Sequence, residues 1–362
     1  MSPRTGMSMS KQKFKIKDEN RFQVIDAFRY FFFLVVSIFV ASLVFDIVVA
    51  IVASVSGTPK ETLDNSETVT ILSTVMSPIV LIAYSLVYSK IRKVRLRTSF
   101  NDGQRLSLLP ISVAIVLAII AIFLFSPFMD LVEYGFMQLG YNPDPTIPLQ
   151  EKMQSSIGYF FLGLLIYALL PAIAEEIVFR GVIQNSILSK YKGWIAISIS
   201  TFLFVLMHGA LQQTVYQLVM GIMLGYVACV GGSILYSIIL HFLNNTFVIL
   251  FSCFEIVPYL SENAIYYNIY SMIFPVCIFL LGVALAGILF WVLKYLRTKN
   301  FFRYEPKKKN KQVTNEDFEN TKLGIKDLWK NSSYNEKVFA LSGIVLVGII
   351  WIINTISGFI SS

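Results

Sequence analysis

Two adjacent carboxylates and a guanidinium lie inside an apolar stretch of the chain, residues 171–181. They belong to Glu175, Glu176 and Arg180, and their neighbours are Pro, Ala, Ile, Val, Phe and Gly. An ionisable side chain at membrane depth is costly, so by default it marks a functional site with a partner. These residues are therefore the first candidates for chemistry.

Two further polar positions follow in equally apolar segments. The first is His208, and Phe204 precedes it by one helical turn, so the Phe ring can pack beside the imidazole. The second is His241, which Asn245 follows at the same spacing. These are the 2 histidines of the chain. Each alone would be explained by a hydrogen bond between helices, but together with a carboxylate they indicate a site.

Helical spacing separates the roles of the two glutamates. Glu176 and Arg180 are i,i+4 neighbours, so we expect an ion pair on one face of a helix. Glu175 points about 100° away from Glu176 and has no basic residue at helical spacing. We therefore expect Glu176 to be held by Arg180, and Glu175 to be the carboxylate that reacts.

These residue types suit hydrolysis. A carboxylate and an imidazole at one wet point can activate water, with the carboxylate as general base. A second imidazole and an amide can donate hydrogen bonds to the oxyanion of an attacked carbonyl. We assign Glu175 and His208 to water activation, and His241 and Asn245 to the oxyanion, without a cofactor. The alternative is a zinc site with Glu175, His208 and His241 as ligands, although the chain has no His-Glu-x-x-His motif.

The composition indicates a polytopic membrane protein. Hydrophobic residues make up 56% of the 362 residues and charged residues only 14%, which is too apolar for a soluble domain. The net charge of +8 gathers in a few loops instead of on one folded face, which argues against nucleic-acid binding. The 3 cysteines fall in apolar segments at spacings that match no disulfide or metal pattern.

The apolar runs predict an all-α fold of about eight to nine transmembrane helices. The fourth run carries the glutamates, the short fifth run ends at His208, and the seventh carries His241. The expected spans are 27–55, 69–88, 109–129, 157–188, 194–208, 214–230, 234–254, 269–296 and 338–360.

The spans divide the chain into a basic N-terminal segment (1–26), three membrane helices with their loops (27–154), a four-helix catalytic core (155–256), an eighth helix with a basic loop (257–337) and an additional C-terminal helix (338–362).

Basic and non-basic loops alternate along this arrangement, so lysine and arginine gather on one side of the membrane. The basic regions are the N-terminus, 89–106, 189–193 and 297–337, whereas 57–67, 130–152 and 256–268 are not basic. Since basic loops stay in the cytoplasm, we expect a multi-pass protein with a cytoplasmic N-terminus, which in a bacterium lies in the cell membrane.

Helix geometry predicts that the polar residues meet. Glu175 lies 14 residues before Ser189, and His208 lies 15 residues after Gly193. At ~1.5 Å per residue both sit roughly 20 Å from the inner ends of neighbouring antiparallel helices. His241 rises only about 12 Å on the same arithmetic, a difference that helix tilt can absorb.

At these residues the sequence resembles the CPBP intramembrane endopeptidases, which include the type II CAAX prenyl proteases and the bacterial Abi immunity proteins. The motifs appear in the family's order across residues 155–250, as Glu175-Glu176-x-x-x-Arg180, then Phe204-x-x-x-His208, then His241-x-x-x-Asn245. The resemblance implies a CAAX-protease-like helical core and a glutamate-dependent peptidase. It also implies that the first Glu and first His activate water, while the second His and the Asn line the oxyanion hole.

Other functions remain open from the sequence. Buried Glu and His residues also form proton relays in transporters, but the chain shows no inverted repeat. A non-catalytic membrane scaffold or immunity protein is a further alternative. The expected partners are the lipid bilayer and a peptide or protein substrate at the membrane, lipidated or secreted, and no nucleic acid.

Overall fold

The computed structural model describes residues 22–94, 96, 107–141, 147–254, 269–299, 324, 327, 330 and 333–360. Every element in these ranges is a helix. The basic N-terminal segment up to residue 21, the 256–268 loop and the lysine run 307–311 lie outside the described residues.

In the described part of the chain, eight helical segments are long and apolar enough to cross a membrane. This confirms an all-α polytopic membrane protein. Six are single helices: α1 (Val24–Ser56), α3 (Glu67–Ile91), α12 (Leu211–Gly231), α13 (Ile234–Phe254), α14 (Ile269–Thr298) and α17 (Tyr334–Ile360). The predicted short fifth span is α11 (Gly193–His208), with 16 residues. Two short helices, α2 (Lys60–Asp64) and α7 (Gln150–Ser155), lie in connecting loops.

The other two spans contain π-helical turns. The third consists of α5 (Leu108–Ile120), η2 (Ala121–Phe125) and α6 (Ser126–Gln138), and the fourth of α8 (Ile157–Gly163), η3 (Leu164–Leu169), α9 (Leu170–Glu176), η4 (Ile177–Gln184) and α10 (Asn185–Leu188). π-Helical turns occur frequently at functional sites. Here η4 begins directly after Glu176.

The third span is longer than expected. We predicted that it ends near residue 129, with a loop from Asp130 onward, but α6 continues to Gln138. Pro127 occupies the first turn of α6, where its fixed φ favours a helix. Asp130 and Glu133 are half-buried among apolar residues of the same helix. The acidic residues therefore belong to a helix end and not to a loop.

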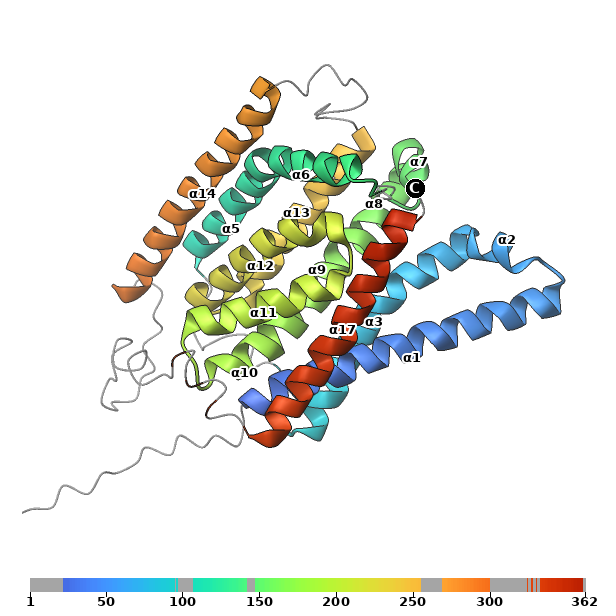
Figure 1. Ribbon diagram of the computed structural model, residues 1–362, viewed down its shortest axis with the longest axis horizontal. Helices are drawn as coiled ribbons and strands as arrows, with labels where there is room; N and C mark the ends of the chain where they lie inside the picture. Colours follow the sequence, from blue (N-terminus) through green and yellow to red (C-terminus); the bar gives the residue numbers. More distant parts are fainter. Residues whose placement is uncertain are drawn as a thin grey trace, which may run out of the picture.

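The site-bearing helices occupy the middle of the bundle (Figure 1). α11 packs along α12, and α13 packs against α12, α5 and α9. α17 lies along α1 at one edge, and α14 covers η2 and α6 at another. The catalytic core that we predicted is thus enclosed by helices from both ends of the chain.

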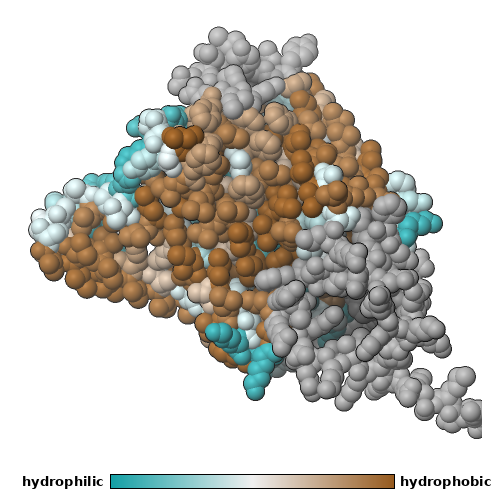
Figure 2. Space-filling model, turned by 180° about the vertical axis from the view of Figure 1, so that it is seen from behind, coloured by the Kyte–Doolittle hydropathy of each residue, from teal (hydrophilic) through white to brown (hydrophobic). Residues whose placement is uncertain are grey.

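The outer surface is suited to lipid. In Figure 2, hydrophobic residues cover the middle of the face shown, and hydrophilic residues gather toward its edges. Large apolar side chains such as Phe39, Leu43 and Trp291 are exposed by half or more of their surface. An exposed apolar surface of this extent marks a membrane contact.

Candidate active site

The three side chains predicted to act together converge in the structure. Glu175 comes from α9, His208 is the last residue of α11, and His241 lies in the first half of α13. Glu175 Oε2 lies 3.8 Å from His208 Nε2 and 3.8 Å from His241 Nε2. The expected match in depth is therefore confirmed for both histidines. Gly209 ends α11 directly after His208 with φ 66°, a left-handed conformation that glycine adopts without steric cost.

The other nitrogen of each imidazole faces an oxygen. His208 Nδ1 lies 2.9 Å from the Phe204 carbonyl oxygen, and His241 Nδ1 lies 3.1 Å from Glu176 Oε1. Carbonyl and carboxylate oxygens only accept hydrogen bonds, so both Nδ1 atoms carry the proton. In the neutral form each Nε2 is then an acceptor that faces Glu175. Glu175 Oε2 is itself buried and has no hydrogen-bond partner among the described residues.

Glu176 and Arg180 form the predicted ion pair. Arg180 Nη1 lies 2.7 Å from Glu176 Oε1, and both side chains are fully buried. Arg180 also donates from Nη2 to the backbone oxygen of Gly221 at 3.1 Å. Sequence spacing predicted the pair, but not that His241 or the Gly221 carbonyl joins it, because those contacts depend on how α13 and α12 pack.

Phe204 packs beside the reactive groups, as predicted. Its ring centroid lies 4.5 Å from that of His208 and 6.0 Å from that of His241. The guanidinium carbon of Arg180 sits 4.7 Å from the Phe204 ring centroid, a cation–π distance. Phe179 closes the other side at 5.1 Å, edge-to-face. The ring therefore fixes both the imidazole of His208 and the cation that holds Glu176.

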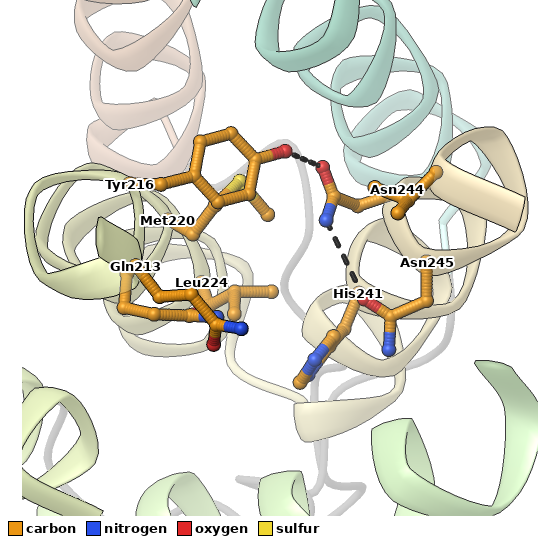
Figure 3. A pocket seen from close by; sticks show the side chains of 9 residues that line it. Gln213, Tyr216, Met220, Leu224, His241, Asn244 and Asn245 are labelled. Atoms are coloured by element: carbon orange, nitrogen blue, oxygen red, sulfur yellow. Dashed lines mark hydrogen bonds between the residues drawn. The ribbon is translucent and has the colours of Figure 1, made fainter. Parts of the chain in front are cut away.

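Asn245 lies at a cavity between α12 and α13 (Figure 3). Its Oδ1 accepts a hydrogen bond of 3.4 Å from Asn244 Nδ2, and Asn244 Oδ1 accepts one from Tyr216. The Asn245 Nδ2 group is left to donate elsewhere. Through these two hydrogen bonds, Asn244 orients the Asn245 amide.

The cavity has a volume of about 230 Å³. It adjoins the site through His241 and Asn245, which both line it, whereas Glu175 and His208 are not among the lining side chains. The α12–α13 cavity, as we call it, is lined by Gln213, Tyr216, Gln217, Met220, Leu224, His241, Asn244, Asn245 and Val248.

Sequence reasoning did not identify the α12 side of this cavity. The available signal was the pair Gln213 and Gln217, two uncharged amides one helical turn apart in a segment otherwise apolar enough to span a membrane. Tyr216, which lies between them, gave no signal, because tyrosine is common throughout the chain.

Two glycines of α12, Gly221 and Gly225, accept hydrogen bonds at their backbone oxygens from polar side chains of η4. Gln184 Nε2 donates to the Gly225 oxygen at 2.9 Å, as Arg180 does to that of Gly221. Both donors and both acceptors are four residues apart, so the two contacts repeat along the interface. A Cβ at Gly221 would lie 2.7 Å from Thr201 Cγ2. This close approach of α12 also positions Arg180.

The zinc alternative was examined against the same geometry. Ligands of a tetrahedral zinc ion lie roughly 3.4 Å apart, given bonds of about 2.1 Å. The 3.8 Å separations at Glu175 are longer, and no group of His, Cys, Asp and Glu within the described ranges is arranged to hold a metal ion. The function proposed below uses protein groups and water.

Comparison with known proteins gives a match for the central part of the chain. Residues 157–247 match a family model described as Type II CAAX prenyl endopeptidase Rce1-like. The match runs from α8 into α13 and contains the glutamate pair, both histidines and Asn245. Neither the curated proteins nor the solved structures give a significant match. The match supports the resemblance of residues 157–247 to the CPBP/CAAX family of intramembrane proteases.

Proposed function

We propose that this protease hydrolyses peptide bonds with a water molecule activated by Glu175 and His208, without a metal ion. The observation that carries the proposal is the convergence of two imidazole Nε2 atoms on Glu175 Oε2, at 3.8 Å each. This distance is too long for a direct hydrogen bond. In the reaction that we propose, a water molecule bonds to both the carboxylate and an imidazole and so links them. Such a water is held beside a base in a poorly solvated site.

The reaction follows general acid–base chemistry. Glu175 removes a proton from the water, and the water oxygen attacks the carbonyl carbon of the peptide bond. The carbonyl oxygen becomes an oxyanion, stabilised by hydrogen bonds from His241 and Asn245. The C–N bond then breaks as the proton passes from Glu175 to the leaving nitrogen. The products are a new carboxyl group and a free amine.

The two histidines suit different roles because their Nδ1 partners differ. His208 donates from Nδ1 to a neutral carbonyl, so its Nε2 stays an acceptor and orients the water. His241 donates from Nδ1 to the carboxylate of Glu176, and a ring that carries a proton on both nitrogens also has a donor at Nε2. Charged His241 can then donate from Nε2 to the oxyanion.

Glu176, Arg180 and Phe204 position the two histidines and do not react themselves. The buried pair of Glu176 and Arg180 holds the Nδ1 side of His241, and Phe204 packs against His208. The substrate on this account is a polypeptide at the membrane, lipidated or secreted. We also propose a cytoplasmic N-terminus, from the distribution of Lys and Arg, and a place in the cell membrane if the host is a bacterium.

The test is a comparison of membrane peptides in cells that carry the wild-type protein or the Glu175→Ala variant. Peptides that end at a defined bond in the wild type and disappear in the variant support the proposal. Identical peptide profiles would favour a scaffold. Purified protein dialysed against a chelator should keep its activity, and loss that zinc restores would favour the metal alternative.

A further inference from the structure

Burial along the α12–α13 cavity shows in which direction it opens. On α12, Gln213 is exposed, whereas Met220 and Leu224 are buried. On α13, His241 is 5% exposed and Val248 is 38% exposed. Both walls therefore run from a closed floor at the catalytic histidine to an open mouth at Gln213 and Val248. The mouth lies at the N-terminal end of α12, since Gln213 is the third residue of that helix.

Several contacts show which other helix ends lie on the mouth side. Next to Gln213, Gln212 accepts from Tyr141, which follows α6. A Cβ at Gly209 would lie 2.9 Å from Asn354, near the end of α17. Lys152 of α7 pairs with Glu67 at the start of α3, and α7 also contacts the end of α13. Figure 1 shows α2, α7 and the end of α17 toward the same end of the bundle.

The opposite helix ends are tied together by a second set of contacts. Arg92 after α3 binds Asp26 in the first turn of α1. The Ser107 amide, before α5, donates to Tyr236 near the start of α13. Arg297 at the end of α14 donates to the Val230 oxygen near the end of α12. The molecule therefore has two distinct ends, and the cavity opens toward the first.

The two ends of the molecule differ in their content of lysine and arginine. The described chain segments that join helices at the mouth end are 57–66, 139–141, 147–156 and 209–210, and their basic residues are Lys60 and Lys152. The described helix ends and turns at the other end carry Arg92, Lys93, Lys190, Lys192 and Arg297. Lys and Arg mark the cytoplasmic side. The mouth is therefore on the side away from the cytoplasm.

We propose that the active site takes its substrate from the extracytoplasmic face, as an uncharged segment of a polypeptide that has already crossed or entered the membrane. The proposal rests on the protease function proposed above and names its substrate class. Among the residues that the structure describes, no Asp, Glu, Lys or Arg side chain lines the cavity, so a charged segment would lose its hydration without a partner. The amides of Gln213, Gln217 and Asn245 can instead bond to a peptide backbone.

Sidedness is tested without any substrate. In a background with Cys229, Cys253 and Cys277 replaced by serine, single cysteines are introduced as Gln213→Cys at the mouth, Asn65→Cys on the same side and Ser189→Cys on the basic side. All three parent residues have exposed surfaces. A membrane-impermeant maleimide added to intact cells should label the first two, and Ser189→Cys only after permeabilisation. Labelling of Ser189→Cys in intact cells, or Gln213→Cys that is unreactive from outside, would overturn the proposal.

Substrate delivery gives a second readout that separates the two proposals. A quenched fluorescent peptide library is first screened with detergent-solubilised wild-type protein and with Glu175→Ala. The cleaved peptides are then added to intact cells and to inside-out vesicles. Cleavage in intact cells, with uncharged residues around the bond, is the expected result. Cleavage by inside-out vesicles alone refutes the sidedness and leaves the protease function standing. Cleavage that persists in Glu175→Ala refutes the proposed function instead.

Discussion

Glu175 and Glu176 are adjacent in the chain, yet their surroundings separate them by role. Glu176 is fully buried against Arg180 and His241, so its charge is compensated on two sides. Glu175 keeps 20% of its side chain exposed and has a buried Oε2 without a hydrogen-bond partner in the described part of the chain. One carboxylate is therefore committed to structure, and the other is available to bind water.

Removal of the Arg180 side chain should lower the stability of the protein. Arg180→Ala leaves Glu176 as an uncompensated buried charge, a change that costs about 3–5 kcal/mol. We expect a much lower midpoint of thermal unfolding in detergent. The matched control is Lys60→Ala, which breaks the exposed i,i+4 pair of Lys60 and Asp64 and should leave the midpoint unchanged. Equal midpoints for both variants would contradict a structural role of the buried pair.

Phe204 should matter for rate more than for substrate affinity. Phe204→Leu removes the ring that contacts His208 and the Arg180 guanidinium. Misplacement of a catalytic group by about 1 Å can cost 10²-fold in rate, so kcat should fall by up to about that factor while KM changes little. Phe202→Leu on the same helix, at a side chain that is 48% exposed, should keep full activity. Equal kcat values in the two variants would argue against positioning by Phe204.

At the scale of elements, the close contact of α12 with η4 and α11 holds the site together. Gly221 allows the approach of Thr201, and its carbonyl accepts from Arg180. Gly225 likewise allows the approach of Ile197, and its carbonyl accepts from Gln184. Any shift of α12 therefore moves the group that holds Glu176, and with it His241.

Gly221→Ala should accordingly reduce both stability and activity. The new Cβ would lie 2.7 Å from Thr201 Cγ2, and overpacking of this kind costs about 1–3 kcal/mol. The control is Gly287→Ala on α14, where nothing lies within 4 Å of the added Cβ. We expect a lowered unfolding midpoint only for Gly221→Ala. A normal midpoint and normal cleavage in that variant would show that α12 can move without cost.

Much of the element structure was predictable because apolar runs and motif spacing act locally. The spans, the Glu176–Arg180 pair and the packing of Phe204 on His208 all follow from positions along one helix. The π-helical turns and the continuation of α6 past Asp130 were not predictable, since they depend on packing partners. The link from His241 to Glu176 joins residues 65 positions apart, beyond any local pattern.

At the scale of the whole molecule, the described helices form an apolar bundle around the candidate active site. Helices from outside the matched core pack against it on two edges, α17 through Trp351 with Thr214 and α14 through Arg297 with Val230. These contacts tie corresponding helix ends together. The bundle therefore shields Glu175, which keeps 20% of its side chain exposed, and we propose that the α12–α13 cavity admits the peptide.

The central claim is that Glu175 and the histidines beside it hydrolyse a peptide bond. The most direct measurement is the rate at which purified protein cleaves a peptide selected from a library. Glu175→Gln should lower this rate by about 10²–10⁴-fold, the range for loss of a general base, with an unchanged unfolding midpoint. Glu133→Gln, which alters a half-buried glutamate of α6, should cleave at the wild-type rate. Wild-type cleavage by Glu175→Gln would contradict the claim.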